Sequence, residues 1–378
     1  MSLKINNSDE SRARLVNLDF LRGIFIILAL QQHFTYYINM WYVEYFRDSM
    51  ALTSTYSVHF PMIGKQISTD VINHWMAYLF TPWVSQIYLT MAAFNLAKRD
   101  QFSFKEDSPT KFKIYGLILI YFIFENFLVA PNLGQAISFY PIMLWMIILG
   151  LISLVNRYLG FRGVLVLSLI AMLRFVIPVE VLSDLFEEVI QNNIHPGFEY
   201  DARLEYFILS GCLGFIMGHV HYHFARYKHN KDLLFMGFGI LLMMIYFLVG
   251  DSFTIYDNDF FRTEHDLART FSGTAYIIGI QALVISGFLW LEKKNLKISL
   301  PVINWIGIYS LMIFALHRIF FVKIIAPISV LLGSLMGRTL SAATWEIYVY
   351  IIITLGMCYL VQKSSIVEVI LQKKSKGQ

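Results

Sequence analysis

Apolar runs of about 20 residues recur along the chain, separated by short polar connections. Within each run the apolar residues are continuous rather than alternating, which is typical of spanning helices and not of the strands of a membrane barrel. In hydrocarbon every backbone N–H and C=O needs a partner inside the protein, so we predict an all-α transmembrane helix bundle of about ten spans. The predicted spans are 18–39, 74–97, 112–131, 136–156, 162–180, 203–224, 232–250, 267–291, 300–322 and 344–362.

The composition excludes a water-soluble surface. Only 15% of the 378 residues are charged and 57% are hydrophobic, whereas a soluble domain carries about 25% charged residues. The polar connections are too short to form a separate domain. We therefore expect one integral membrane domain over residues 1–378, in which 1–17 and 363–378 are terminal segments.

Lysine and arginine are distributed unevenly among the connections. Basic residues precede the first span and follow the second, fourth, sixth, eighth and tenth, whereas the connections after the fifth and seventh are acidic. Basic connections stay in the cytoplasm, so both termini are expected there, in a multi-pass protein of the inner (plasma) membrane. Residues 324–337 are apolar but too short to span, and we predict an outer re-entrant or interfacial segment.

Three ionisable side chains lie in the first span, where a charge is costly and therefore indicates function. Arg22 and His33 are eleven positions apart, which places them on one helix face and about 16 Å apart along the axis. Asp19 lies one turn before Arg22 and can pair with it. The alternative interpretation is that Arg22 is an interfacial anchor and His33 a packing residue.

The stretch LDFLRG at 18–23, with His33 after it, resembles the opening helix of the membrane acyltransferase-3 family, whose signature is an arginine and a histidine at this spacing. The stretch GIYS at 307–310, followed by His317, is similar to the last-but-one helix of that family. The stretch TPW at 81–83 and His74 resemble the second helix of the related heparan-glucosaminide acetyltransferase-like and YeiB-like membrane proteins. The resemblance favours the superfamily over either branch.

This resemblance implies a membrane-bound acyltransferase. It would move an acyl group, with acetyl expected, from acyl-CoA to a hydroxyl or amine of a glycan, glycolipid or other envelope acceptor. Acyl-CoA would be a co-substrate, and no tightly bound cofactor, metal or nucleic acid is expected. His33 would be the catalytic base, because an imidazole titrates near neutral pH. Arg22 would hold the anionic donor, oriented by Asp19.

Further polar residues complete the candidate site. Glu125 lies inside the third span, and His317 lies at the depth expected for His33, so we predict a shared pocket of these three residues. The alternative is that Glu125 and His317 make separate structural hydrogen bonds. His74 is a further candidate, and whether His33 or His74 is the main catalytic histidine stays open.

His219 and His223 share a helix face and would suit a metal, but no carboxylate or cysteine follows at ligand spacing. We interpret them as a hydrated cytoplasmic helix end. The competing functional class is a secondary transporter or exporter of an anionic or glycan intermediate. Matched pairs of interrupted helices are typical of such transporters, and the sequence shows none. A third interpretation is a regulator that keeps the fold without catalysis.

Overall fold

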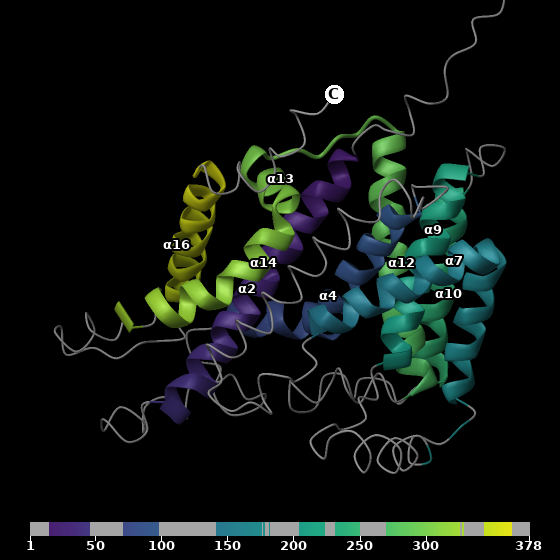
Figure 1. Ribbon diagram of the computed structural model, residues 1–378, viewed down its shortest axis with the longest axis horizontal. Helices are drawn as coiled ribbons and strands as arrows, with labels where there is room; N and C mark the ends of the chain where they lie inside the picture. Colours follow the sequence, from purple (N-terminus) through teal and green to yellow (C-terminus); the bar gives the residue numbers. More distant parts are fainter. Residues whose placement is uncertain are drawn as a thin grey trace, which may run out of the picture. The chain divides into compact units, whose positions relative to one another are not determined.

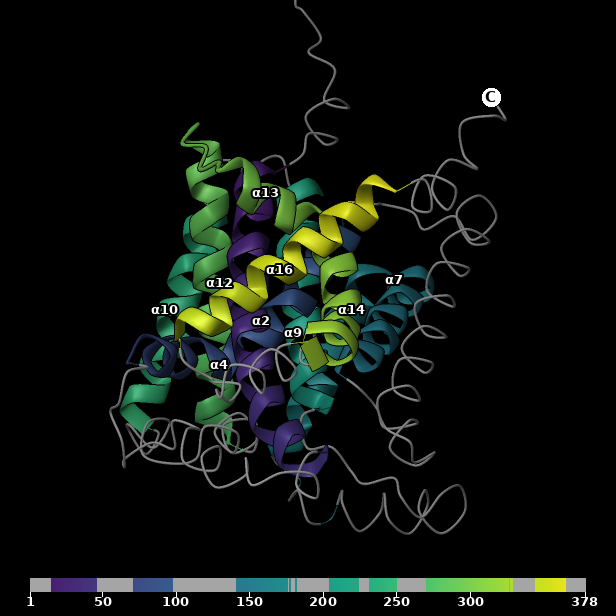
Figure 2. The same cartoon turned by 90° about the vertical axis from the view of Figure 1, so that its left-hand side faces the viewer.

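The computed structural model describes residues 15–45, 71–97, 141–175, 204–223, 231–249, 270–325 and 344–364, with residues 177, 181, 327 and 328. Every regular element in these ranges is helical (Figure 1 and Figure 2), which confirms the all-α class for this part of the chain. The helices are α2 (Val16–Tyr45), α4 (Val71–Leu96), α7 (Pro141–Met172), η1 (Leu173–Phe175), α9 (Leu204–His223), α10 (Lys231–Val249), α12 (Phe271–Lys293), α13 (Pro301–Ile308), α14 (Ser310–Phe320), η5 (Phe321–Ile325) and α16 (Thr344–Lys363).

Three of the described helical segments are long and apolar enough to cross a membrane. They are Trp145–Met172, Lys231–Val249 and Phe271–Lys293. The outer face of α10 is apolar, as lipid contact requires: Leu234 and Leu248 are 68% and 77% exposed. These helices indicate a membrane protein. The predicted total of ten spans is not confirmed, and the predicted span 112–131 lies outside the described residues.

A glycine divides α7 into two helical stretches. Gly160 has φ 65° and ψ −167°, a conformation that side-chain-bearing residues rarely adopt. The chain therefore breaks here instead of running from 141–159 into 161–172 as one rod. The break falls between the predicted spans 136–156 and 162–180.

The chain forms two compact units. Unit 1 comprises Met1–Leu18 and Pro82–Ile298, and it contains α7, α9, α10, α12 and most of α4. Unit 2 comprises Asp19–Thr81 and Ser299–Gln378, and it contains α13, α14, α16 and most of α2. The single membrane domain expected from the sequence stays a prediction.

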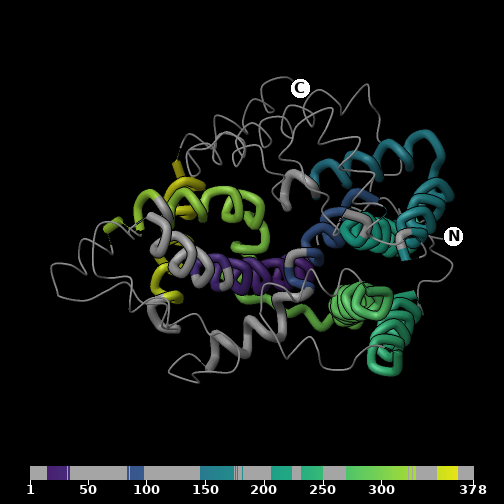
Figure 3. The backbone as a smooth tube through the Cα atoms, turned by 90° about the horizontal axis from the view of Figure 1, so that it is seen from below, coloured from purple at the N-terminus to yellow at the C-terminus, as the bar shows by residue number. Residues whose placement is uncertain are grey.

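Glycines bring the helices of unit 1 together. Gly239 of α10 and Gly279 of α12 face one another so closely that a side chain on either would press on the carbonyl oxygen of the other. Figure 3 shows these two helices side by side. Gly214 of α9 meets the backbone of Thr90 of α4 in the same way. Small residues at helix contacts are the expected solution in lipid, where association relies on close packing.

A buried polar cluster sits at the crossing of α4, α9 and α12. Thr90 Oγ1 lies 3.0 Å from the carbonyl oxygen of Ser210 and also contacts the side-chain amide of Gln281. The Nε2 group of Gln281 donates to Ser210 Oγ at 3.3 Å. All three residues are fully buried. Because their polar atoms satisfy one another, we assign this cluster a structural role.

Helix ends of unit 1 meet at one end of the unit. His223 Nε2 at the end of α9 donates to the carbonyl oxygen of Ala97, just after α4, at 2.9 Å. Lys231 Nζ at the start of α10 donates to the Val220 carbonyl oxygen at 3.2 Å, which satisfies an acceptor that the end of α9 leaves unpaired. At the same place Lys293 Nζ of α12 lies 3.8 Å from Asp232 of α10.

The break in α7 reaches the same end of unit 1, because Phe161 stacks on His219 of α9 with ring centroids 4.3 Å apart. Exposed cations accompany these contacts. We call this region the basic end, and its exposed cations are Arg157, Arg162, Lys293, Lys294 and Lys297.

In unit 2, α2 and α13 cross with their backbones in contact. A Cβ on Gly23 of α2 would clash with the carbonyl oxygen of Ile303, and a Cβ on Gly307 of α13 would clash with that of Asp19. Both glycines are therefore required by the closeness of the two helices. The motif glycines at 23 and 307 thus have a packing role that spacing alone does not reveal.

The predicted span 300–322 is not one continuous helix. The helix α13 ends at Ile308, and the segment Ser310–Ile325 leaves it at an angle of 84°. Tyr309 between them has φ −98° and ψ 17°, outside the helical region. The segment predicted to be re-entrant, 324–337, lies mostly outside the described residues.

The helix α16 packs on this bent pair. Its Tyr359 ring lies 5.6 Å from Trp305 of α13, and Tyr350 lies 5.8 Å from Phe321. Near the bend, Gln362 Nε2 donates to the hydroxyl oxygen of Tyr309 at 3.2 Å. These contacts hold both arms of the bend.

We expect Gly307→Ala to destabilise the protein, because the new methyl group meets backbone atoms of α2 that cannot move aside. The expected loss is about 1–3 kcal/mol. The matched control is Gly287→Ala, where a Cβ has open space, and helix propensity predicts a gain of up to about 1 kcal/mol. Thermal unfolding of the purified protein in detergent measures both. Equal midpoints in the two variants would contradict the proposed α2–α13 contact.

Candidate functional site

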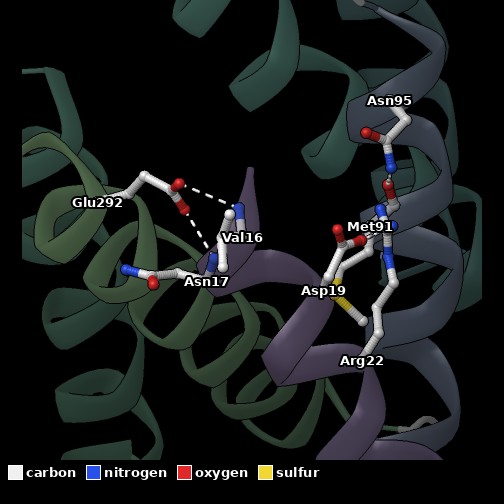
Figure 4. A network of polar contacts seen from close by, with 7 residues as sticks. All are labelled: Val16, Asn17, Asp19, Arg22, Met91, Asn95 and Glu292. Carbon is white, nitrogen blue, oxygen red and sulfur yellow. Dashed lines mark hydrogen bonds and ion pairs between the residues drawn. The ribbon is translucent and has the colours of Figure 1, made fainter. Parts of the chain in front are cut away.

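The start of α2 is held by the end of α12. The Glu292 carboxylate accepts the backbone N–H groups of Val16 at 3.0 Å and Asn17 at 2.7 Å (Figure 4). These are donors that a helix start leaves without an intrahelical partner, and the negative charge also suits the positive end of the helix dipole. The Asn17 side chain donates to the Leu296 carbonyl oxygen and accepts the N–H of Ile298, at 3.0 and 2.8 Å.

One turn further along α2, Asp19 and Arg22 form an ion pair. Arg22 Nη1 lies 3.2 Å from Asp19 Oδ1, and Figure 4 shows both side chains on the same helix. Asp19 is buried and Arg22 is partly buried. The sequence predicted this pairing, and the distance confirms it. The carboxylate compensates a guanidinium that would otherwise be expensive near an apolar environment.

The imidazoles of His33 on α2 and His317 on α14 are in contact. His33 Nδ1 and His317 Nε2 are 2.8 Å apart, which is hydrogen-bond distance. His317 is only 3% exposed, whereas His33 is partly buried. The sequence grouped these two histidines by depth alone, and the structure brings them together.

A second hydrogen bond fixes the tautomer of each neutral ring. His317 Nδ1 lies 2.6 Å from the carbonyl oxygen of Phe314, which can only accept, so Nδ1 carries the proton. In neutral His317 the Nε2 atom is then an acceptor, and His33 Nδ1 must donate to it. Neutral His33 therefore carries its lone pair on Nε2. The hydrogen bond to His317 therefore fixes the orientation of the His33 ring as well as its tautomer.

Aromatic rings hold the two imidazoles in place. Phe314 meets His33 edge-on, with centroids 5.5 Å apart, and Phe34 stacks on Phe321 at 4.5 Å. Phe34 and Phe321 are both buried. Beyond Phe320 the helix widens into the π-helix η5. Such single-turn widenings occur frequently at functional sites.

Arg318 is the residue of this site to which the sequence analysis gave no role. It follows His317 on α14 and is 8% exposed. Its positive charge acts on the imidazoles of both His33 and His317. The available signal was an arginine inside the predicted span 300–322, since intramembrane charges indicate function.

Two predicted site residues are not placed beside His33. Glu125 lies outside the described residues, so the three-residue pocket that includes it stays a prediction. His74 lies in the first turn of α4, but its side chain is also outside the described part.

The histidines at the end of α9 have packing and capping contacts. His219 stacks on Phe161, and His223 caps the end of α4 through Ala97. In the described ranges, no group of three or more His, Cys, Asp and Glu side chains is arranged to hold a metal ion.

The tautomer assignment makes a spectroscopic prediction that does not depend on activity. In protein labelled with ¹⁵N-histidine, we expect neutral His33 to show a protonated Nδ1 and a bare Nε2. Comparison of spectra from wild type and His33→Gln assigns the resonances, and His317→Gln should then alter the His33 signals because the acceptor nitrogen is lost. A His33 ring protonated at Nε2 and unaffected by His317→Gln would contradict the assignment.

Comparison with known proteins adds no relative: no family model matches the chain, and no curated protein is significantly similar to it. The resemblance to the membrane acyltransferase superfamily therefore remains an inference from the residues of α2, α4, α13 and α14.

Proposed function

We propose that the protein is a membrane-bound acyltransferase. It moves an acyl group, with acetyl expected, from acyl-CoA to a hydroxyl or amine of a glycan, glycolipid or other envelope acceptor. The observation that carries the proposal is the 2.8 Å hydrogen bond between His33 and His317. This hydrogen bond fixes the neutral tautomer of His33 before substrate binds and leaves the lone pair on Nε2, as a general base requires.

The proposed reaction uses His33 Nε2 as a proton carrier. As the acceptor oxygen or nitrogen forms a bond to the thioester carbon, its proton passes to His33 Nε2. The tetrahedral intermediate then collapses, the carbon–sulfur bond breaks, and the thiolate takes the proton from His33. His317 stabilises the transient imidazolium by accepting the hydrogen bond from Nδ1. The cycle returns His33 to its starting tautomer.

The proposed role of Arg22 is to hold the charged part of the donor. Arg22 and His33 lie on the continuous helix α2, about 16 Å apart along its axis. Coenzyme A carries its phosphates and its thioester at opposite ends of an extended arm, so a cation and a base separated in this way suit it. A guanidinium is well matched to phosphate oxygens. Asp19 keeps the guanidinium oriented.

The proposed topology places the basic end in the cytoplasm. The ends of α4, α9 and α12 and the start of α10 lie together there with five exposed cations, Arg157, Arg162, Lys293, Lys294 and Lys297. The start of α2 joins them through Glu292. The cations support a cytoplasmic position for this end and for the start of α2 beside it, because cations are retained on that side. Ten spans and a cytoplasmic C-terminus in the inner membrane complete the proposal. The donor then enters from the cytoplasm.

Transport is the second candidate function, and one observation favours it. The bend at Tyr309 interrupts an apolar segment, and transporters use interrupted helices to bind substrates. The sequence did not reveal this interruption. The alternative is therefore a secondary transporter or exporter of an anionic or glycan intermediate, with Arg318 and the histidine pair as its binding residues.

We expect His33→Gln to lower the rate of acyl transfer by about 10²–10⁴-fold, the usual contribution of a general base. The amide fills a similar volume but cannot accept a proton at neutral pH. His219→Gln is the matched control, because His219 lies at the basic end and should leave the rate unchanged. Transfer from labelled acetyl-CoA in membrane vesicles, normalised to the amount of inserted protein, measures both. Near-normal transfer by His33→Gln would remove His33 from the mechanism.

The two functional classes differ in how they treat the donor. Purified wild-type protein incubated with acetyl-CoA labelled in the acetyl group should slowly release or transfer the label, because water can replace a missing acceptor. A transporter should leave the thioester intact. A normal thermal midpoint shows that the purified protein is folded. If the folded protein leaves the amount of acetyl-CoA unchanged after a long incubation, transport is favoured.

A further inference from the structure

Acyl transfer creates a negative charge that the proposed reaction has not yet accounted for. When the acceptor attacks, the thioester carbonyl oxygen becomes an oxyanion, and stabilising this charge is usually the largest single contribution to catalysis. Neither His33 nor His317 can serve, because the first accepts a proton and the second is occupied by its hydrogen bonds. The following inference rests on the proposed function.

The residue with suitable chemistry is Arg318. It is more than nine-tenths buried, and it directly follows the histidine that orients the base. Successive helix residues are rotated by about 100° around the helix axis, so Arg318 and His317 lie on adjacent faces of α14 and not on opposite ones. His317 lies 2.8 Å from His33, so Arg318 follows a member of this histidine pair in the chain, and its charge acts on both imidazoles.

The environment makes this charge effective. The Phe34 ring lies 6.2 Å from the His317 ring and stacks on Phe321. Both phenylalanines are buried, as is His317, so this side of the histidine pair is apolar and shielded from water. In such surroundings a fixed cation interacts far more strongly than it does in water. A guanidinium also presents several N–H donors in one plane. Because it stays protonated, it does not compete with His33 for the proton of the acceptor.

We propose that Arg318 stabilises the oxyanion of the thioester carbonyl during acyl transfer. Its N–H groups donate to the carbonyl oxygen as that oxygen gains charge. An electron pair of the oxyanion re-forms the carbon–oxygen double bond as the carbon–sulfur bond breaks. The sulfur leaves with the electron pair of that bond and takes the proton from His33. Arg318 neither gains nor loses a proton, so the only proton in transit is the one carried by His33.

The test compares Arg318→Gln and Arg318→Lys with wild type, and uses Arg157→Gln at the exposed basic end as the matched control. The oxyanion is present in the tetrahedral intermediate and develops in the transition states on either side of it, but it is absent from the bound substrate. We therefore expect Arg318→Gln to lower kcat by about 10²–10³-fold with KM nearly unchanged. Arg318→Lys keeps the charge but not the fork of donors, so its kcat should lie between those of Gln and wild type. The pH profile of Arg318→Lys should match that of wild type, because this variant keeps the positive charge that acts on the base.

Each outcome decides the question. If wild type itself transfers no acetyl group, the proposed function fails before Arg318 is examined. If wild type is active and Arg318→Gln keeps the wild-type kcat, or changes only KM, the oxyanion role is overturned. Should Arg318→Gln lose its thermal transition, the Lys variant decides: a lowered kcat at unchanged KM and unchanged midpoint supports the role, and a wild-type kcat overturns it.

Discussion

The hydrogen bond between His33 and His317 depends on how closely α2 approaches the bent pair of α13 and α14. That approach is set at Gly23 and Gly307, where two helix backbones touch without side chains between them. A single methyl group at Gly307 would push α13 away from α2. The candidate chemistry therefore depends on a packing constraint at Gly23, about three turns of α2 away from His33.

The bend at Tyr309 matters for the same reason. A straight helix from 301 to 320 would contact α2 only where the two helices cross. Because the chain turns by 84°, α13 contacts the first turns of α2 through Gly307 while α14 presents His317 to His33 further along. The contacts of α16 with Trp305, Tyr309 and Phe321 hold both arms. The two motif stretches at 18–23 and 307–310 therefore form one helix crossing, and this crossing brings His33 and His317 together.

Much of the fold could be predicted from hydrophobic periodicity. The predicted spans 203–224 and 232–250 agree with α9 and α10 to within a residue at each end. The ion pair of Asp19 and Arg22 could also be predicted, because it follows from helical spacing alone. Local rules of this kind need only the sequence of one helix.

Features that join different helices could not be predicted in this way. The bond between His33 and His317 depends on rotation and tilt of α2 against α14, which a list of spans does not contain. No proline or charged residue lies between positions 302 and 316 to mark the bend at Tyr309. Glu292 capping α2 joins residues far apart in the chain. Tertiary packing decides each of these.

The most direct measurement is a cryo-electron microscopy map of the full chain in lipid nanodiscs with a non-reactive acetyl-CoA analogue whose sulfur is replaced by a methylene group. The account predicts the His33 ring hydrogen-bonded to His317, with its Nε2 facing the acetyl group and the phosphates of the analogue on the Arg22 side. An analogue bound away from α2, or a His33 ring turned from His317 toward lipid, would contradict it.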